Sequence, residues 1–184
     1  MGFPIPGPIG PMGTSGLALI AVINPTGTNT VTFSSIPGTY KHLRLVGMGR
    51  SSGAGTGNDF PLMTFNADGA AHYARQTVEF TGVAAPSSFQ ATADSGAFIA
   101  VFPTAGDIAN YPGTFILDII NYANTTFAKN YQGQYMGVTS ALLSSLFTNT
   151  FAGVWSGTAA ITSITIAETS NYVTGTSFSL YGFG

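Results

Sequence analysis

The side chains that could carry acid–base or nucleophilic chemistry are few in this chain, and they are far apart. Hydrolysis of a glycosidic bond needs two carboxylates that face each other across that bond. The seven carboxylates form no paired motif and stand at Asp59, Asp68, Glu79, Asp94, Asp107, Asp118 and Glu168. Serine is abundant, so a chance alignment of a serine with a histidine carries little weight as a sign of a hydrolase triad. We therefore expect no catalytic residues, and we expect that the protein is not an enzyme.

Side chains that bind transition metals are equally sparse. The sequence contains no cysteine, which excludes disulfides and thiolate metal sites. His42 and His72 could form an iron-type site with Asp68 or Asp118, but no spacing in the sequence supports such a set. We expect no metal site and no cofactor, and we expect both histidines to be structural or exposed.

A glycine-rich stretch at residues 51–58, SSGAGTGN, follows a predicted strand, as a phosphate-binding loop would. Such a loop must open a helix whose N-terminus faces the phosphates. Here Pro61 leads into another β-type run, and no Gly-Lys-Ser/Thr is present. We interpret the stretch as a mobile surface loop.

Asp118 lies within the apolar run FILDII. A carboxylate buried in such a run needs a partner, such as an arginine or the backbone of a turn. We interpret Asp118 as one half of a structural or interfacial salt bridge rather than as a catalytic acid.

Aromatic residues are plentiful, with fourteen Phe and eight Tyr. In strands, aromatic side chains mostly fill the core and the contacts between subunits, and this is our main interpretation. The alternative is that Tyr131, Tyr135 and Trp155 are exposed and stack on a sugar.

These residues must be positioned by strands, because apolar residues alternate with polar ones from residue 17 onward. In the run TNTVTFSSI, Val31 and Phe33 fall on one face of a predicted strand. In YKHLRLVGMGR, Leu43 and Leu45 point one way and Arg44 points the other. The period of two predicts strands with one buried face.

Turn residues divide the whole chain into short β-type runs. Beyond the two alternating runs, these are LALIAVI, FPLMTFN, HYARQTVEF, AFIAVFP, GTFILDIINYA, TFAKNYQGQYMG, SLFTNTFAGVWSG, AITSITIAE and SFSLYGFG. About ten strands at this spacing predict an all-β domain at residues 17–184, and specifically a jelly-roll-like β-sandwich. A short helix is compatible with the pattern only near Ile108 or at residues 140–146.

Residues 1–16, MGFPIPGPIGPMGTSG, differ in composition from the rest of the chain. Glycine recurs at every third position from residue 7 to residue 16, but so few triplets cannot hold a collagen-like triple helix alone. Two interpretations stay open: an extended Gly/Pro-rich arm that docks on a partner, or three arms side by side on a threefold axis. In both, the arm is an attachment device, and the expected partner-binding residues are Phe3, Ile5, Ile9 and Met12.

Only 7% of the residues are charged, against a typical share of about 25%. Monomers keep apart in solution by surface charge, so we expect partner subunits to cover much of this surface. Five basic residues are too few and too scattered for nucleic-acid binding. The apolar run at residues 17–23 is too short to span a membrane, and no Lys or Arg precedes it as in a signal peptide. We expect no membrane contact and assembly in a host cytoplasm.

Three segments carry a resemblance to a known group of proteins. Residues 31–52 read VTFSSIPGTYKHLRLVGMGRSS, residues 155–164 read WSGTAAITSI, and residues 175–182 read GTSFSLYG. They resemble an early hairpin and the closing strands of small virion proteins of tailed phages, which often end in an F-S-L-Y-G strand. The resemblance implies a capsid decoration or tail-appendage component without catalytic residues.

Composition and resemblance together lead to one expected function and one alternative. The expected function is that of a capsid decoration (cement) protein, which as a homotrimer binds the major capsid protein or another virion protein and stabilises the head. The protein would then be located in the virion. The alternative is a tail fibre or receptor-binding appendage that recognises a glycan on the host surface.

Overall fold

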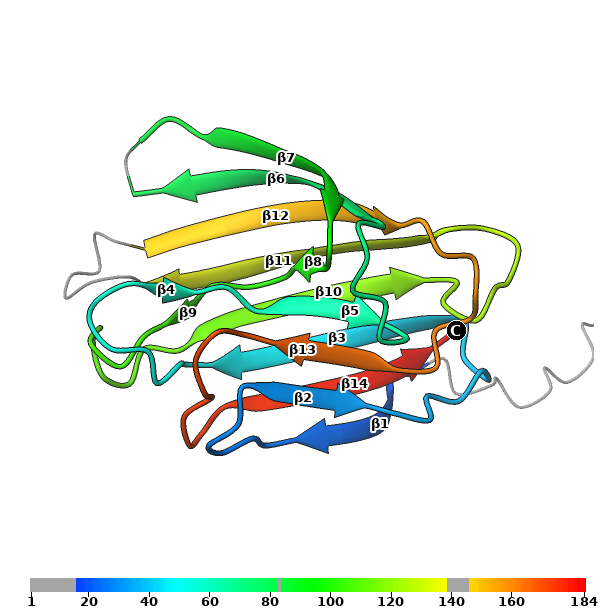
Figure 1. The fold of residues 1–184 in the computed structure, drawn as a ribbon, viewed down its shortest axis with the longest axis horizontal. Helices are drawn as coiled ribbons and strands as arrows, with labels where there is room; N and C mark the ends of the chain where they lie inside the picture. The colour runs from blue at the N-terminus through cyan, green and yellow to red at the C-terminus, as the bar shows by residue number, and fades with distance from the viewer. Residues whose placement is uncertain (1–15, 83, 139–145) are drawn as a thin grey trace, which may run out of the picture.

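The computed structural model describes residues 16–82, 84–138 and 146–184, and within these residues the chain is all-β. The strands form an eight-stranded, a four-stranded and a two-stranded sheet (Figure 1). The strands are β1 (Ala18–Ile23), β2 (Thr30–Phe33), β3 (His42–Gly49), β4 (Asn58–Asp59), β5 (Leu62–Phe65), β6 (Tyr73–Thr81), β7 (Ser87–Asp94), β8 (Ala97–Phe98), β9 (Phe102–Pro103), β10 (Gly113–Ile120), β11 (Lys129–Val138), β12 (Leu146–Trp155), β13 (Ile164–Ala167) and β14 (Ser177–Phe183). The predicted all-β sandwich is confirmed, with two main sheets of unequal width.

The large sheet has the strand order β1-β14-β3-β10-β11-β12-β6-β7, and neighbouring strands are antiparallel. Its inner face is apolar because alternate residues turn inward. Leu43 and Leu45 of β3 and Leu117 of β10 are fully buried, whereas Ile116 faces outward and is 51% exposed. The predicted alternation in β3 is confirmed.

The small sheet has the order β2-β13-β5-β8 and supplies the opposite wall of the core. In its register, Ile166 of β13 lies between Val31 of β2 and Met63 of β5, and all three are buried. The predicted inward orientation of Val31 and Phe33 is also confirmed.

Aromatic rings join the two sheets across the core. The ring of Phe65, from the small sheet, lies 5.6–6.2 Å from the rings of Tyr73, Tyr131 and Trp155, all from the large sheet. Tilted and edge-to-face pairs of this kind add about 0.5–1.5 kcal/mol each beyond the area that they bury. The aromatic residues therefore fix how one sheet sits on the other.

Because four strands cannot cover eight, parts of the large sheet are left open. Figure 1 shows the β6–β7 hairpin extending past β8, the edge strand of the small sheet. Side chains of β7 are almost all exposed. This strand was not predicted, because a strand that is exposed on both faces has no apolar alternation to reveal it.

Two further predictions differ from the structure. The run AFIAVFP was expected to be one strand but forms two, β8 and β9, on either side of the buried residues 99–101. A continuous apolar run does not show where a chain crosses from one sheet to another. Residues near Ile108 form turns rather than the short helix considered above, and residues 139–145 lie outside the described part of the chain.

Gly47 is the point at which β3 packs most closely against a core ring. A Cβ placed on Gly47 would overlap the ring of Phe115, which is itself held by the rings of Phe102 and Phe178. The strand therefore needs a residue without a side chain here, because a buried, packed ring has no room to move.

We expect Gly47→Ala to lower the free energy of unfolding by about 1–3 kcal/mol, through overpacking. The matched control is Gly69→Ala, because a Cβ at Gly69 would have no neighbour within 4 Å. Both substitutions remove similar freedom from the unfolded chain, so the difference between them isolates the steric clash. Urea unfolding followed by circular dichroism measures it, and equal stabilities of the two variants would contradict the packing argument.

Candidate functional site: the open face of the large sheet

The outward face of the large sheet is a broad surface that no other element covers among the described residues. We call it the open face and define it by the outward side chains of five adjacent strands, β3, β10, β11, β12 and β6. It includes Val46, Met48, Thr114, Ile116, Gln134, Met136, Thr148, Thr150, Val78 and Phe80.

Strand register arranges these side chains in rows that run across the sheet. In one row Met48, Met136 and Phe80 alternate with two threonines, and these three apolar side chains are 42–48% exposed. In the next row Val46 and Ile116 lie side by side and are followed by Gln134, Thr150 and Val78. The open face thus combines apolar contact area with neutral hydrogen-bonding groups.

Among the described residues, the only ion pair on the open face joins Arg44 to Asp118. Arg44 Nε and Nη2 each donate a hydrogen bond of 2.7 Å to one carboxylate oxygen of Asp118. This hydrogen bonding, more than the charge attraction that adds to it, raises the pKa of Arg44 above its ordinary value. The predicted salt-bridge role of Asp118 is confirmed, and the partner is the residue directly opposite in the β3–β10 register.

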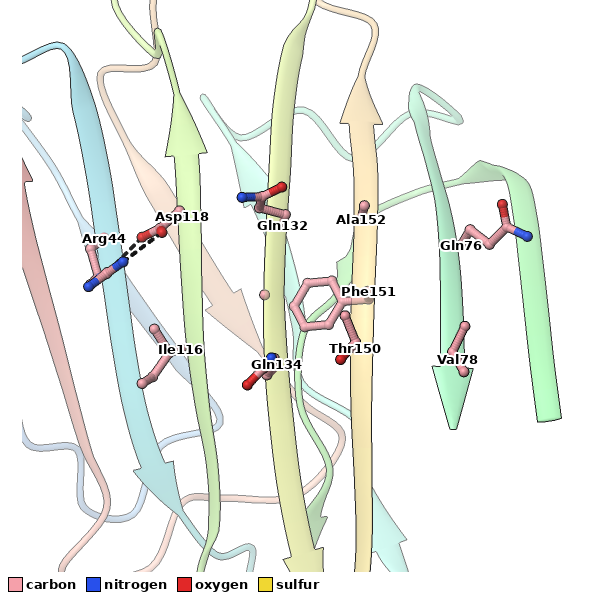
Figure 2. A pocket seen from close by; sticks show the side chains of 11 residues that line it. Arg44, Gln76, Val78, Ile116, Asp118, Gln132, Gln134, Thr150, Phe151 and Ala152 are labelled. Carbon is pink, nitrogen blue, oxygen red and sulfur yellow. Dashed lines mark hydrogen bonds and ion pairs between the residues drawn. The ribbon is translucent and has the colours of Figure 1, made fainter. Parts of the chain in front are cut away.

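A shallow depression of about 670 Å³ lies on this face, and the ion pair forms part of its lining. Figure 2 shows the side chains around it. Besides the paired Arg44 and Asp118, its polar lining comes from glutamine amides and a threonine hydroxyl, at Gln76, Gln132, Gln134 and Thr150. These groups donate and accept hydrogen bonds without changing charge. They suit the binding of a neutral polar or protein surface more than acid–base chemistry.

The carboxylate of Asp68 is engaged in a structural contact. Trp155 Nε1 donates a 2.7 Å hydrogen bond to Asp68 Oδ2, and the Ala70 amide donates to Oδ1. His72 Nδ1 also lies 2.8 Å from Oδ2. These contacts, the Trp155 bond foremost, lower the pKa of Asp68 to about 2. The turn after β5 is thereby tied to the end of β12.

The other histidine, His42, is also structural. Its Nδ1 accepts a hydrogen bond from the Asn121 amide, and its ring lies 5.2 Å from that of Phe183. Over residues 16–82, 84–138 and 146–184, no group of three or more His, Asp or Glu side chains is placed to hold a metal ion. The iron-type set of both histidines with Asp68 or Asp118 is therefore not assembled.

The aromatic residues considered for sugar stacking are buried. Tyr131, Tyr135 and Trp155 are only 1%, 4% and 4% exposed. The small sheet covers this part of the inner face, and burial raises the pKa of both tyrosines. The main interpretation as core residues holds for these three side chains, and the sugar-stacking alternative is wrong for them.

The glycine-rich stretch at residues 51–58 is a loop that packs against a carboxylate of the same chain, that of Asp107. The carboxylate of Asp107 accepts hydrogen bonds from the amides of Gly57 and Thr104, at 3.3 and 3.1 Å. Thr104 Oγ1 in turn donates to the Gly55 carbonyl oxygen, at 2.7 Å. The backbone amides that a phosphate would need are thus partly used within the chain.

The hydrolase spacing Gly-x-Ser-x-Gly was expected to be absent, but it occurs at residues 49–53. Its central residue, Ser51, is fully buried, and its hydroxyl accepts a hydrogen bond from the Gly53 amide. The segment leads from β3 into the glycine-rich loop rather than into a helix. This arrangement lacks the exposed serine at a strand-to-helix turn that the motif requires.

The predicted partner-binding residues Phe3, Ile5, Ile9 and Met12 lie outside the described part of the chain. The described residues contain no helix that is both long enough and apolar enough to cross a membrane.

Acid titration of the Asp68 contact can be followed directly, because Trp155 is the only tryptophan. The pKa of Asp68 is lowered from 3.8 to about 2 in the folded protein, so its stabilising contribution is present above about pH 4 and is lost as pH falls toward 2. We expect a change in Trp155 fluorescence with a midpoint near pH 2. Asp68→Asn should abolish this transition, whereas Glu79→Gln should retain it. An unchanged transition in Asp68→Asn would contradict the assignment.

Comparison of the chain with protein-family models, with curated proteins and with solved structures finds no match. The resemblance to tailed-phage virion proteins therefore stays a prediction from the residues. The proposed function rests mainly on the geometry of the open face.

Proposed function

We propose that this chain is a structural protein of a tailed-phage particle, a homotrimeric capsid decoration protein that works by binding other proteins. The observation that carries the proposal is the open face. Its two rows cross five strands, and their apolar side chains Met48, Met136, Phe80, Ile116 and Val78 are exposed, whereas Val46 is half-buried. The face carries one internally neutralised ion pair. Apolar patches of this extent mark interaction sites in soluble proteins.

The composition of the open face matches that of the centre of a protein interface. Such centres are depleted in charged residues and enriched in Met and aromatic side chains. The ion pair between Arg44 and Asp118 has no net charge and is already hydrogen-bonded. A subunit that covers it therefore buries no unpaired charge. In the proposed assembly, copies of the sandwich associate through this face.

The arm at residues 1–16 gives the proposed trimer a means of attachment to the particle. It directly precedes β1, an edge strand of the large sheet on which Leu19 and Val22 are 57% and 46% exposed. An edge strand offers unpaired backbone groups for pairing with another chain. Three arms on one trimer would act together through a high effective concentration.

The receptor-binding alternative has less support. It depended on exposed aromatic residues that could stack on a glycan, and the three considered, Tyr131, Tyr135 and Trp155, are buried. Binding of the isolated protein to host cells would still favour this alternative over capsid decoration.

We expect Ile116→Lys to convert the trimer to monomers, because it places an unpaired charge at the centre of the apolar rows. Analytical ultracentrifugation of wild-type and variant proteins measures the change. The matched control is Phe127→Lys, since Phe127 is 71% exposed but lies in the turn between β10 and β11, away from the open face. A monomeric wild-type protein, or equal dissociation of both variants, would count against association through this face.

We expect deletion of residues 1–16 to abolish binding to capsids that lack this protein, while the remaining domain still folds and forms trimers. Co-sedimentation with such capsids, together with ultracentrifugation of the truncated protein, measures both properties. Full occupancy of capsids by the truncated protein would refute the attachment role of the arm.

A further inference from the structure

One end of the sandwich brings together three segments that are distant in sequence. The Ser52 amide donates a 2.8 Å hydrogen bond to the Asn171 carbonyl oxygen, and the Ala105 amide donates one of 3.1 Å to the Gly53 carbonyl oxygen. Ser51 also forms a β-bridge with Tyr172. The glycine-rich loop, the segment after β9 and the loop after β13 are thus fixed against one another.

Two carboxylates at this end have oxygens without hydrogen-bond partners among the described residues. Glu168 is only 7% exposed, and neither of its carboxylate oxygens is hydrogen-bonded. Oδ2 of Asp59 is likewise buried and unpartnered. A buried carboxylate without a partner is costly, so these oxygens require an explanation.

The two carboxylates are directed toward the same region. Ala167, the last residue of β13, pairs with Leu62 of β5. Glu168 is the next residue after Ala167, so it lies beside the segment that links Asp59 to β5. A Cβ placed on Gly53 would lie 3.1 Å from Asp59 Oδ2 and 3.0 Å from Ser170 Oγ. Oxygens from β4 and from the loop after β13 therefore both lie close to Gly53.

Electrostatic coupling supports this proximity. Burial, with the negative charge of Asp59 as a second cause, raises the pKa of Glu168 to about 8. The Glu168 charge also adds to the burial that raises the pKa of Tyr172. The positive charge at this end, on Arg50, is directed elsewhere: its guanidinium donates hydrogen bonds to the carbonyl oxygens of Thr104 and Asp107.

We propose that Asp59 and Glu168 bind a divalent, oxygen-seeking cation of the Ca²⁺ type beside Gly53, with the Ser170 hydroxyl as a neutral neighbour. All of the unpartnered atoms involved are oxygens that accept rather than donate. Ca²⁺ is coordinated by carboxylate, carbonyl, hydroxyl and water oxygens at 2.3–2.6 Å in flexible geometry. The charge of one such ion would neutralise both carboxylates.

Protonation of Glu168 is a weaker solution to the same problem. It removes the charge of Glu168, but it leaves the carboxylate of Asp59 charged, with Oδ2 buried. A cation satisfies the oxygens of both residues at once. Bound there, it would also hold β4 and the loop after β13 together, independently of the open face.

The pH dependence of the melting temperature distinguishes the cation-free protein from the cation-bound protein. Without the cation, Glu168 ionises near pH 8 in the folded protein but near 4.5 when unfolded, so the melting temperature should fall as pH rises from 4.5 to 8. The groups that face Glu168 here are Asp59 and Tyr172. The carboxylate of Asp107, also at this end, is turned to the amides of Gly57 and Thr104. With the cation bound, this fall should disappear.

Calorimetric titration of the chelator-treated, full-length protein with CaCl₂ tests the proposal. We expect saturable binding of one ion per chain at pH 7, with proton release detected as a dependence of the heat on the buffer. MgCl₂ should bind at least tenfold more weakly, because Mg²⁺ sheds its water reluctantly. Circular dichroism melting in CaCl₂ and in EDTA should show that Ca²⁺ raises the melting temperature.

Glu168→Gln should weaken Ca²⁺ binding at least tenfold and remove the pH dependence measured in EDTA. If Glu168→Gln does not fold, Asp59→Asn is the second variant. The matched control is Glu79→Gln, which should bind Ca²⁺ as the wild type does. Absence of saturable binding by the wild-type protein at millimolar CaCl₂ would overturn the proposal in favour of a proton alone. Undiminished binding by Glu168→Gln or Asp59→Asn would overturn it by placing the ion elsewhere.

Discussion

The structure depends on the packing of the inner face of an eight-stranded sheet against a sheet half as wide. Phe65 carries this contact at the centre, because its ring meets Tyr73, Tyr131 and Trp155 from the opposite sheet. Apolar burial of this kind is the main stabilising term in a chain that has no disulfides. The mismatch in width also leaves the β6–β7 hairpin uncovered, and among the described residues no further layer covers the outward face of the large sheet.

Several of the few charged groups are committed to specific contacts within the chain, which leaves little charge to keep copies of the chain apart. Arg44 is paired with Asp118, and Arg50 is directed at backbone carbonyl oxygens. Lys129 is nearly fully buried, its ammonium donates to the carbonyl oxygens of Phe127 and Thr158, and burial lowers its pKa. The open face is therefore neutral overall, which is consistent with a surface that meets another protein.

The two surfaces discussed above differ in kind. The open face is broad and shallow, and apart from the Arg44–Asp118 ion pair its lining side chains are uncharged. The end of the sandwich around Asp59 and Glu168 is narrow, buried and rich in oxygens without donors. The first suits a protein partner and the second suits a small cation, so one domain can carry both without either using the residues of the other.

The class of the fold and the direction of many side chains follow from the order of the residues alone. A period of two placed Val31, Phe33, Leu43 and Leu45 in the core, because neighbouring residues of a strand must point to opposite faces. The position of Asp118 in an apolar run was enough to predict an ionic partner, since an unpaired buried carboxylate is too costly. Periodicity could not reveal β7, because no face of that strand is buried.

Only the tertiary structure decided which distant residues meet. Arg44 became the partner of Asp118 through the β3–β10 register, and the small sheet, not any local pattern, buried Tyr131, Tyr135 and Trp155. Asp59 and Glu168 come to the same end of the sandwich through the pairing of β5 with β13. Strand pairing between distant segments depends on how whole faces fit together, and the local sequence around each residue does not contain that information.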